Sequence, residues 1–150
     1  MTIRLAEEVD FGVIYDALKA RVSEKEWLEE CKGVEVTKQM FIDYCRNLPS
    51  RGIECDGKQI GGVFFDGTQM HIEVLPEYHG RWSLLIPEMG RWVFSIKDPI
   101  QVAVARDNTK INRFMTRNKW PAIKETDDQI TYEMSAKTMP LFDKRQHTAQ

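Results

Sequence analysis

Residues 72–83 of this 150-residue chain read Ile72-Glu73-Val74-Leu75-Pro76-Glu77-Tyr78-His79-Gly80-Arg81-Trp82-Ser83. An apolar strand runs into Pro-Glu-Tyr, then into a basic turn that contains a glycine, and then into a segment patterned as a helix. Such a turn directs main-chain N–H groups and a helix N-terminus towards one point, which suits a phosphate or pyrophosphate group. Strand–turn–helix units are common, so the function of this one has to be judged from the elements on either side of it.

Four strands are predicted up to this turn. Their ranges are about 2–5, 52–56, 59–65 and 69–75. The Asp56-Gly57 and Asp66-Gly67 pairs that separate the last three are strong signals for two-residue hairpins, because both turn positions tolerate a positive φ.

Two helices are predicted between the first and second strands. Apolar residues recur at three- and four-residue steps from Phe11 to about Lys32, which indicates one helix. Thr37 is expected to cap a second helix that ends before Pro49. The residues that this second helix is expected to bury are Met40, Phe41, Tyr44 and Leu48.

After the basic turn the pattern continues with a helix, a strand, a short helix and two strands. The first helix has an apolar stripe of Trp82, Leu85, Met89, Trp92, Val93 and Ile96. Pro87 is tolerated only near a helix start, so this helix should begin late. The later elements are a buried strand at 100–105, a helix at 109–118 that packs Ile111, Phe114 and Met115, and strands at 123–126 and 130–134 joined through Asp127-Asp128.

The resulting order is βααβββαβαββ. The strand before Gly80 and the strand at Ile100 are joined through a helix, so they should be parallel neighbours. We therefore predict an α/β (α+β) fold with a mixed, mostly antiparallel sheet of six or seven strands and helices on both faces. Residues 1–135 suit one domain of ordinary size, and residues 136–150 are polar and aperiodic, as expected of a tail.

The composition excludes several classes of protein. Hydrophobic content of 42% and charged content of 29% are typical of a soluble globular protein. The net charge of −2 and the scattered basic residues argue against a nucleic-acid partner. No apolar run approaches the roughly 18 residues that span a bilayer, and residues 1–5 do not resemble a signal peptide. We expect a cytoplasmic protein without a membrane partner.

The cysteines and histidines give no sign of a disulfide or a metal site. The cysteines are Cys31, Cys45 and Cys55, and the histidines are His71, His79 and His147. The cysteines form no Cys-x-x-Cys pair, so reduced and partly buried thiols are expected. The histidines lack the close spacing of a zinc site, so no metal is expected.

The order of elements and two motifs resemble the GCN5-related N-acetyltransferase (GNAT) superfamily over about Thr2 to Met134. Val74-Leu75-Pro76-Glu77-Tyr78-His79-Gly80-Arg81 is similar to the lead-in of the family's pyrophosphate loop, usually Val-x-Pro-Glu-Tyr-Arg-Gly-x-Gly-x-Gly/Ala. Residues 108–120 match in length the family's Asn-x-x-Ala-x-x-Phe-Tyr-x-x-x-Gly-Phe segment. The Gly-Arg-Trp form of the loop also resembles GNAT-like proteins of bacteriophages and prophages, some of which are virion or head-assembly components.

The resemblance implies an N-acyltransferase that moves an acetyl or other acyl group from acetyl-CoA to a primary amine by direct attack on the thioester. The pantetheine arm would lie in a splay between strands 70–75 and 100–105. Main-chain N–H groups of Val74 and of the loop Gly80 to Ser83 would bind the thioester carbonyl and the phosphates. His79, Arg81 and Trp82 belong to this loop, and Arg81 would add a charge-assisted contact unless it is a solvated surface charge. Asn108 would contact the pantetheine arm, or serve as a helix cap.

Glu73 and His71 alternate with apolar residues, so both face one side of their strand. If that side lines the cleft, Glu73 is the first candidate for the general base, directly or through a water molecule, and His71 is the second. The alternative is a partly solvated face on which both are ordinary polar positions. The glutamates of the first helix could likewise favour a cationic amine or form a solvated face; they are Glu24, Glu26, Glu29 and Glu30.

Departures from the family pattern leave a second hypothesis open. His79 stands at the usual Arg or Gln position, and Trp82 and Leu84 replace two small residues that let the loop backbone approach the pyrophosphate. Met115 stands where many members carry the tyrosine that protonates the departing thiolate. The chain could therefore be a GNAT-fold protein with little or no catalysis, working as a binding or structural component such as part of a phage particle, whose other proteins the tail 136–150 would contact.

Overall fold

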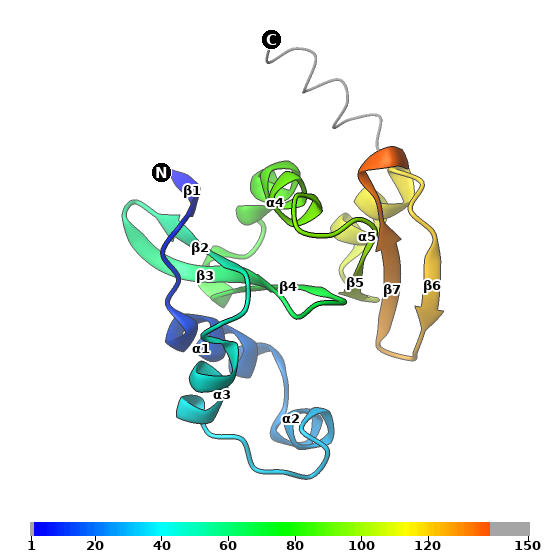
Figure 1. Cartoon of the computed structure of the whole chain (residues 1–150). Coiled ribbons are helices and arrows are strands. Elements are labelled where there is room, and N and C mark those ends of the chain that lie inside the picture. The colour runs from blue at the N-terminus through cyan, green and yellow to red at the C-terminus, as the bar shows by residue number, and fades with distance from the viewer. Residues whose placement is uncertain (1, 139–150) are drawn as a thin grey trace. The chain divides into compact units, whose positions relative to one another are not determined.

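A computed structural model describes residues 2–138 of the chain. The chain divides into two compact units (Figure 1). The first unit comprises the residues up to Phe65 together with Ile72–Ile86, and the second comprises Asp66–His71 and the chain from Pro87 onward. Over residues 2–138, no helix has both the length and the apolar character that a membrane span requires.

The strands of the first four predicted ranges form one antiparallel sheet in the order β1-β2-β3-β4. They are β1 (Ile3–Ala6), β2 (Ser50–Cys55), β3 (Lys58–Phe65) and β4 (Met70–Val74). The hairpin between β2 and β3 is confirmed, because Asp56 and Gly57 have φ angles of 51° and 82°. Positive φ at both central residues is what a tight two-residue hairpin requires.

The second predicted two-residue hairpin, at Asp66-Gly67, is wrong, because residues 66–69 all lie between β3 and β4. The Asp66 carboxylate accepts hydrogen bonds from the main-chain N–H groups of Thr68 (2.9 Å) and Gln69 (2.8 Å). An aspartate that bonds its own backbone in this way stabilises a wider turn.

The first predicted helix, 11–32, is two helices: α1 (Phe11–Arg21) and α2 (Glu24–Glu30). Val22 and Ser23 between them have extended backbone angles. The Ser23 hydroxyl accepts a hydrogen bond from the main-chain N–H of Glu26 (3.1 Å) and so caps α2. The prediction of one helix is therefore wrong, because a new helix begins at a capping serine.

The next helix, α3 (Lys38–Cys45), begins where predicted, since the Thr37 hydroxyl accepts from the main-chain N–H of Met40 (3.2 Å). Its buried side is predicted correctly at Phe41 and wrongly at Met40 and Tyr44, which are 47% and 71% exposed. Cys45, which was not predicted, is buried together with Phe41. Residues one position apart differ by about 100° around a helix, so the two stripes cannot both face the core.

The helices α1, α2 and α3 lie on the same side of the β1–β4 sheet (Figure 1). α1 contacts both β3 and α3. The buried residues of this core are Ile14, Leu18, Trp27, Phe41, Cys45 and Phe64. The Phe41 ring meets the rings of Trp27 and Phe64 edge-on, at centroid distances of 6.3 and 6.2 Å, which is a favoured aromatic geometry.

Cys45 lies in this core, and all three cysteines are free thiols. Burial raises the pKa of the Cys45 thiol to about 11. Because the thiolate is the reactive form, only about one molecule in a thousand is reactive at pH 8. We expect iodoacetamide at pH 8 to leave Cys45 unmodified in the folded protein for a period that modifies it fully in concentrated guanidinium chloride. Peptide mass spectrometry measures both rates, and equal rates would contradict the burial.

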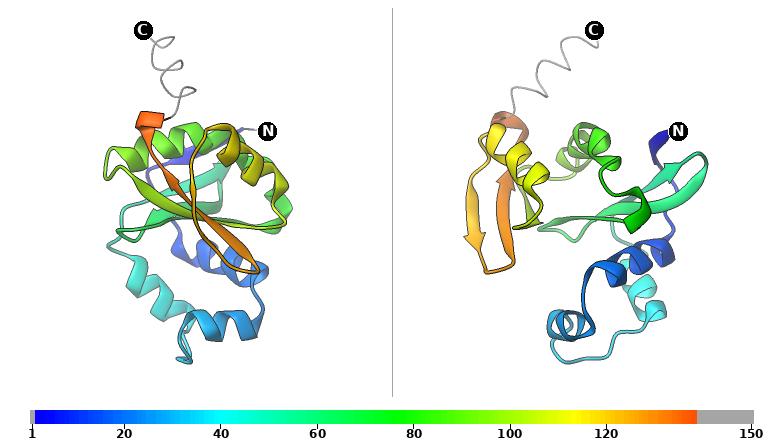
Figure 2. Two further views of the ribbon diagram at one scale, coloured as in Figure 1. Left: turned by 90° about the vertical axis from the view of Figure 1, so that its right-hand side faces the viewer. Right: turned by 180° about the vertical axis from the view of Figure 1, so that it is seen from behind.

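The second unit contains the antiparallel sheet β5-β7-β6. Its elements are α4 (Ile86–Phe94), β5 (Ile100–Ala105), α5 (Thr109–Arg117), β6 (Ala122–Glu125) and β7 (Gln129–Met134). α5 lies against one face of this sheet (Figure 2). β5 alternates between buried and half-buried residues, because one of its faces packs more tightly than the other.

The α+β class and all seven predicted strands are confirmed, although the strands are divided between two antiparallel sheets. The predicted parallel pairing of the strand before Gly80 with the strand at Ile100 takes the form of an isolated bridge between Gln69 and Gln101, near the start of β5. The main-chain N–H of Gln101 donates to the Thr68 carbonyl there (3.0 Å). Residues 136–138, at the start of the predicted tail, form a 3-10 turn, and the rest of that tail, residues 139–150, lies outside the described residues.

Candidate functional site

The end of β4 has one side turned away from the rest of its sheet, because β4 is last in the order β1-β2-β3-β4. The main-chain N–H of Leu75 donates to the Ile60 carbonyl of β3 (2.9 Å). The Val74 carbonyl instead accepts from the His79 ring (2.8 Å). In an antiparallel strand the N–H and C=O of one residue point to the same side and adjacent residues alternate. The Val74 N–H therefore points away from β3.

His79 braces the turn that follows β4. A carbonyl only accepts hydrogen bonds, so Nε2 of His79 carries the hydrogen in its contact with Val74. The ring thus holds the end of β4 and the Gly80 turn at a fixed separation. The His79 residue is exposed, yet its ring contributes to the shape of the loop in this way.

The turn itself is built from two short 3-10 helices, η1 (Pro76–Tyr78) and η2 (Trp82–Leu85), which precede α4. The predicted late start of the helix is confirmed, since α-helical structure begins at Ile86, one residue before Pro87. Gly80 has a φ of +88°, which disfavours any residue with a side chain. Arg81 donates its main-chain N–H to the Tyr78 carbonyl (3.3 Å), so that donor already takes part in the turn.

The two bulky residues of the loop lie differently. Leu84 is 82% exposed, so its side chain does not fill the turn. Trp82 is half-buried and Leu85 is buried. Side chains three residues apart align on a 3-10 helix, so Trp82 lies on the same side as the buried Leu85. Trp82 and Leu84 both replace small residues of the family pattern. Of the two, Trp82 is therefore the one whose side chain lies on the inner side of the loop.

Glu73 is buried, with 8% of its surface exposed, and is held by Arg21 from the end of α1. The guanidinium binds both carboxylate oxygens, with Nη2–Oε1 at 2.6 Å and Nε–Oε2 at 3.2 Å. Burial disfavours the charged guanidinium, but the hydrogen bond and charge of Glu73, with the charges of Glu30 and Glu26, outweigh it and raise the pKa of Arg21. A proton taken up by Glu73 would therefore compete with Arg21 for an oxygen.

Arg21 is a residue that sequence reasoning missed. It stands 52 positions before Glu73 and ends a helix at which a basic residue is ordinary. No local pattern connects the two residues. Gly61 of β3 is a second missed feature, because a Cβ there would lie 2.8 Å from the Val74 Cα and closer still to the Glu73 carbonyl.

The remaining predicted site residues belong to the second unit. The His71 ring lies 2.7 Å from the Asp66 carboxylate. Partial burial opposes ionisation of Asp66, but hydrogen bonds from Gln69, His71 and Thr68 outweigh it and lower its pKa. Asn108 caps α5, since its side chain accepts from the main-chain N–H of Ile111 (3.2 Å). Across the described chain, no group of three or more His, Cys, Asp or Glu residues could hold a metal ion.

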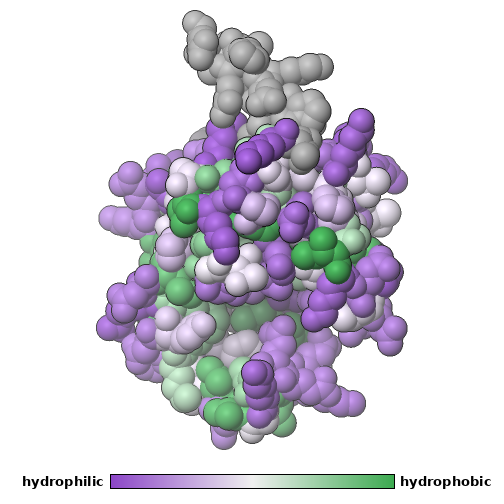
Figure 3. Space-filling model, turned by 45° about the vertical axis from the view of Figure 1, so that its right-hand side comes forward, coloured by the Kyte–Doolittle hydropathy of each residue, from purple (hydrophilic) through white to green (hydrophobic). Residues whose placement is uncertain are grey.

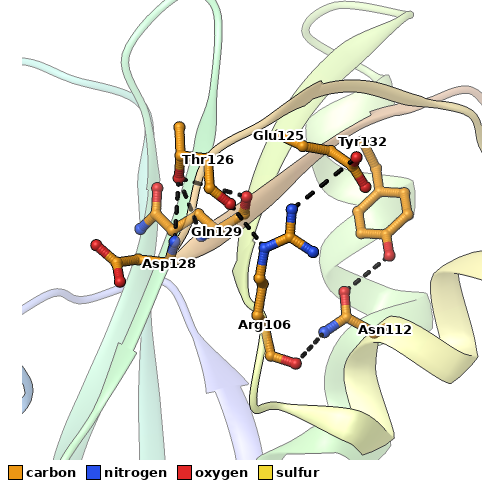
Figure 4. A network of polar contacts seen from close by, with 7 residues as sticks. All are labelled: Arg106, Asn112, Glu125, Thr126, Asp128, Gln129 and Tyr132. Carbon is orange, nitrogen blue, oxygen red and sulfur yellow. Dashed lines mark hydrogen bonds and ion pairs between the residues drawn. The ribbon is translucent and has the colours of Figure 1, made fainter.

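Met115, at the position of the family's tyrosine, is buried, with 3% of its surface exposed. A tyrosine hydroxyl does bind the same helix, because Tyr132 donates to Asn112 Oδ1 (2.7 Å). Asn112 Nδ2 in turn donates to the carbonyls of Ala105 (2.9 Å) and Asn108 (3.0 Å). These bonds join β7, the end of β5 and the first turns of α5, and Figure 4 shows the one between Tyr132 and Asn112.

Arg106 continues this network on the other side. Its Nε donates to the Thr126 carbonyl (2.6 Å; Figure 4). Its main-chain N–H donates to the Asp128 carbonyl (2.9 Å). The turn between β6 and β7 is thereby tied to the end of β5. The segment that carries Asn108 is held from both sides by hydrogen bonds, which fixes the start of α5.

No protein-family model and no curated protein matches the sequence. Solved structures are similar in fold. The coenzyme A complex of the Thermoplasma acidophilum PaiA N-acetyltransferase has a TM-score of 0.57 and 15% identity, over 90% of this chain and 99% of that chain. The acetyl coenzyme A complex of the Campylobacter jejuni N-acetyltransferase PseH has a TM-score of 0.56 and 17% identity, over the same shares.

A GCN5-related N-acetyltransferase from Rhodopseudomonas palustris is also similar, with a TM-score of 0.61 and 15% identity over 90% of this chain and 96% of that chain. Identities this low show the fold alone. The chain has the fold of the GCN5-related N-acetyltransferases.

Proposed function

We propose that the protein is an N-acyltransferase that moves an acyl group from acetyl-CoA, or a similar CoA thioester, to a primary amine. The observation that carries the proposal is the corner from Val74 to Ser83, in which an outward-facing strand N–H is followed by a glycine turn and a helical segment. Coenzyme A in two structures of the same fold supports this choice of ligand.

In this proposal the main chain does most of the binding. The Val74 N–H donates to the thioester carbonyl, where negative charge develops as the amine attacks. The N–H groups of Trp82 and Ser83 begin a helical segment, so they lack partners earlier in that segment and suit the pyrophosphate. Gly80 allows the turn, and the Arg81 guanidinium adds a charge-assisted contact. The contact of Asn108 with the pantetheine arm stays a prediction.

The proposed general base is Glu73, with His71 as the second candidate. The attacking amine must lose a proton, and a carboxylate on the strand that binds the thioester carbonyl is placed to take it directly or through water. Arg21 binds both oxygens of this carboxylate and holds it in place. Met115 has no proton to give, so the departing thiolate would be protonated from water.

A second candidate function is binding of a CoA thioester without turnover. The bidentate Arg21–Glu73 ion pair and Met115 both favour it, because the first restrains the base and the second removes the family's acid. Acyl transfer to any of a panel of primary amines, followed as chromatographically measured free CoA, would decide between the two.

Replacing Gly80 by alanine is expected to weaken acetyl-CoA binding at least tenfold, because φ of +88° becomes strained and the turn must relax. Isothermal titration calorimetry measures the affinity. Gly57→Ala is the matched control, since Gly57 has a φ of +82° and, like Gly80, has nothing within 4 Å of an added Cβ. Both variants should lose about 1 kcal/mol of stability, and only Gly80→Ala should lose affinity. Equal acetyl-CoA affinities in the two variants would show that the Gly80 loop is not part of the binding site.

A further inference from the structure

Exposed hydrophobic side chains are concentrated on one part of the first unit. Of the seven large ones in the described chain, four lie between positions 28 and 44. They are Leu28 (48% exposed), Val34 (56%), Met40 (47%) and Tyr44 (71%). We call α2, the loop after it and α3, with these four residues, the α2–α3 face. Hydrophobic residues gather among hydrophilic ones at the lower end of Figure 3, where Figure 1 places α2 and its loop.

These four exposed side chains are not part of the hydrophobic core, because other residues form the buried sides of α2 and α3. Phe41 and Cys45 supply the buried side of α3, and Trp27 supplies that of α2. Met40 and Tyr44 are four residues apart and form a separate stripe on α3. Single exposed hydrophobic residues are ordinary on a protein surface, but a group of them indicates a contact surface.

The same part of the chain is acidic. Residues 24–35 carry five glutamates and two lysines, a net charge of −3, whereas the whole chain has −2. Lys19 neutralises Glu24 at 2.8 Å, and Arg21 is bound by Glu73. Four glutamates then stand against two lysines, so this short stretch alone carries the net charge of the entire chain. Near α3, the ion pairs Lys38–Asp16 and Arg46–Asp43 are internally balanced.

We propose that the α2–α3 face docks a basic, amphipathic polypeptide segment. Its apolar residues would cover Met40, Tyr44 and Leu28, and its lysine or arginine residues would lie against Glu29 and Glu35. A second copy of this chain is a poorer occupant, because a twofold contact places a surface against itself and would oppose like charges. Nucleic acids and anionic lipid surfaces are repelled for the same reason. The proposal does not depend on acyl transfer.

The test uses the full chain and a fluorescein-labelled helical peptide of leucine and lysine, with binding followed by fluorescence anisotropy. We expect binding that weakens as salt is raised, and at least tenfold weaker binding of the same peptide with glutamate in place of lysine. Met40→Ser with Tyr44→Ser should lower the affinity for the lysine peptide at least tenfold. Ile123→Ser, which alters a residue 46% exposed on β6, is the matched control and should change nothing.

A second pair of substitutions tests the charge separately. Glu29→Lys with Glu35→Lys should also weaken binding at least tenfold, while circular dichroism and acetyl-CoA affinity stay unchanged. Equal binding of the lysine and glutamate peptides would overturn the proposal, as would equal effects of the serine pair and Ile123→Ser. A chain that sediments as a dimer, and becomes monomeric with the serine pair, would overturn it in favour of a second copy. If the chain bound the lysine peptide but failed to bind acetyl-CoA, the proposed function would be wrong and the docking proposal would stand.

Discussion

Replacing Arg21 by methionine is expected to lower the free energy of unfolding by about 3 kcal/mol. The substitution keeps the length of the side chain but leaves the Glu73 carboxylate, 9% exposed, without the guanidinium that binds both its oxygens. A buried charge without its partner is among the costliest defects in a folded protein. The value is taken at the low end of the range because the Arg21 side chain is 42% exposed. Urea denaturation at pH 7 measures it.

Arg4→Met is the matched control for this experiment. Arg4 also binds both oxygens of a glutamate, Glu54, but its side chain is 63% exposed. Exposed pairs contribute at most about 1 kcal/mol, so this control should lose far less stability. The double variant Arg21→Met with Glu73→Leu should recover most of the loss, because no charge is then left buried. If the effects of Arg21→Met and Glu73→Leu simply add, the pair contributes no coupling and the explanation fails.

Replacing Glu73 by glutamine is expected to lower the turnover number of acyl transfer at least 100-fold, the low end of what a general base contributes. An amide cannot accept the proton of the attacking amine, whereas its size and one hydrogen bond to Arg21 are retained. Affinity for acetyl-CoA should change little, because Val74 and the Gly80 turn supply the proposed contacts through the main chain. Steady-state rates with a panel of primary amines, with released CoA measured by chromatography, provide the test.

Glu54→Gln serves as the control here, since it removes a paired glutamate from β2 and leaves β4 intact. His71→Gln tests the second candidate base on the same amines. Full turnover of Glu73→Gln with every acceptor would exclude Glu73 from proton transfer. A large loss in His71→Gln together with full turnover in Glu73→Gln would transfer the role to His71.

Local patterns in the sequence were sufficient for most of the fold. Turn signals and short apolar runs located every strand, and Thr37 marked a helix start that the structure confirms. The break between α1 and α2 was also encoded locally, because Ser23 and Glu26 have the spacing of a capping box. The apolar period of residues 11–32 concealed it. On α3 two neighbouring apolar stripes were available, and only packing against α1 decides in favour of Phe41 and Cys45.

The candidate site was less accessible to sequence reasoning. The Gly80 turn was visible because a positive φ and a strand-to-helix change leave local signals in the sequence. The partner of Glu73 was not, because Arg21 lies on another element 52 positions away. The bond between Tyr132 and Asn112 likewise depends on how β7 and α5 pack. Interactions of this kind are set by tertiary structure, which a single sequence read locally does not reveal.

Gly61 limits how this protein can diverge. Any side chain larger than hydrogen at that position pushes against the peptide between Glu73 and Val74, which are proposed to take the proton and to hold the thioester. A lineage that acquired alanine there would have to displace the end of β4, and with it both proposed roles together. Substitutions in exposed helices and loops can change substrate preference during evolution. Position 61 on the neighbouring strand, in contrast, has to remain glycine.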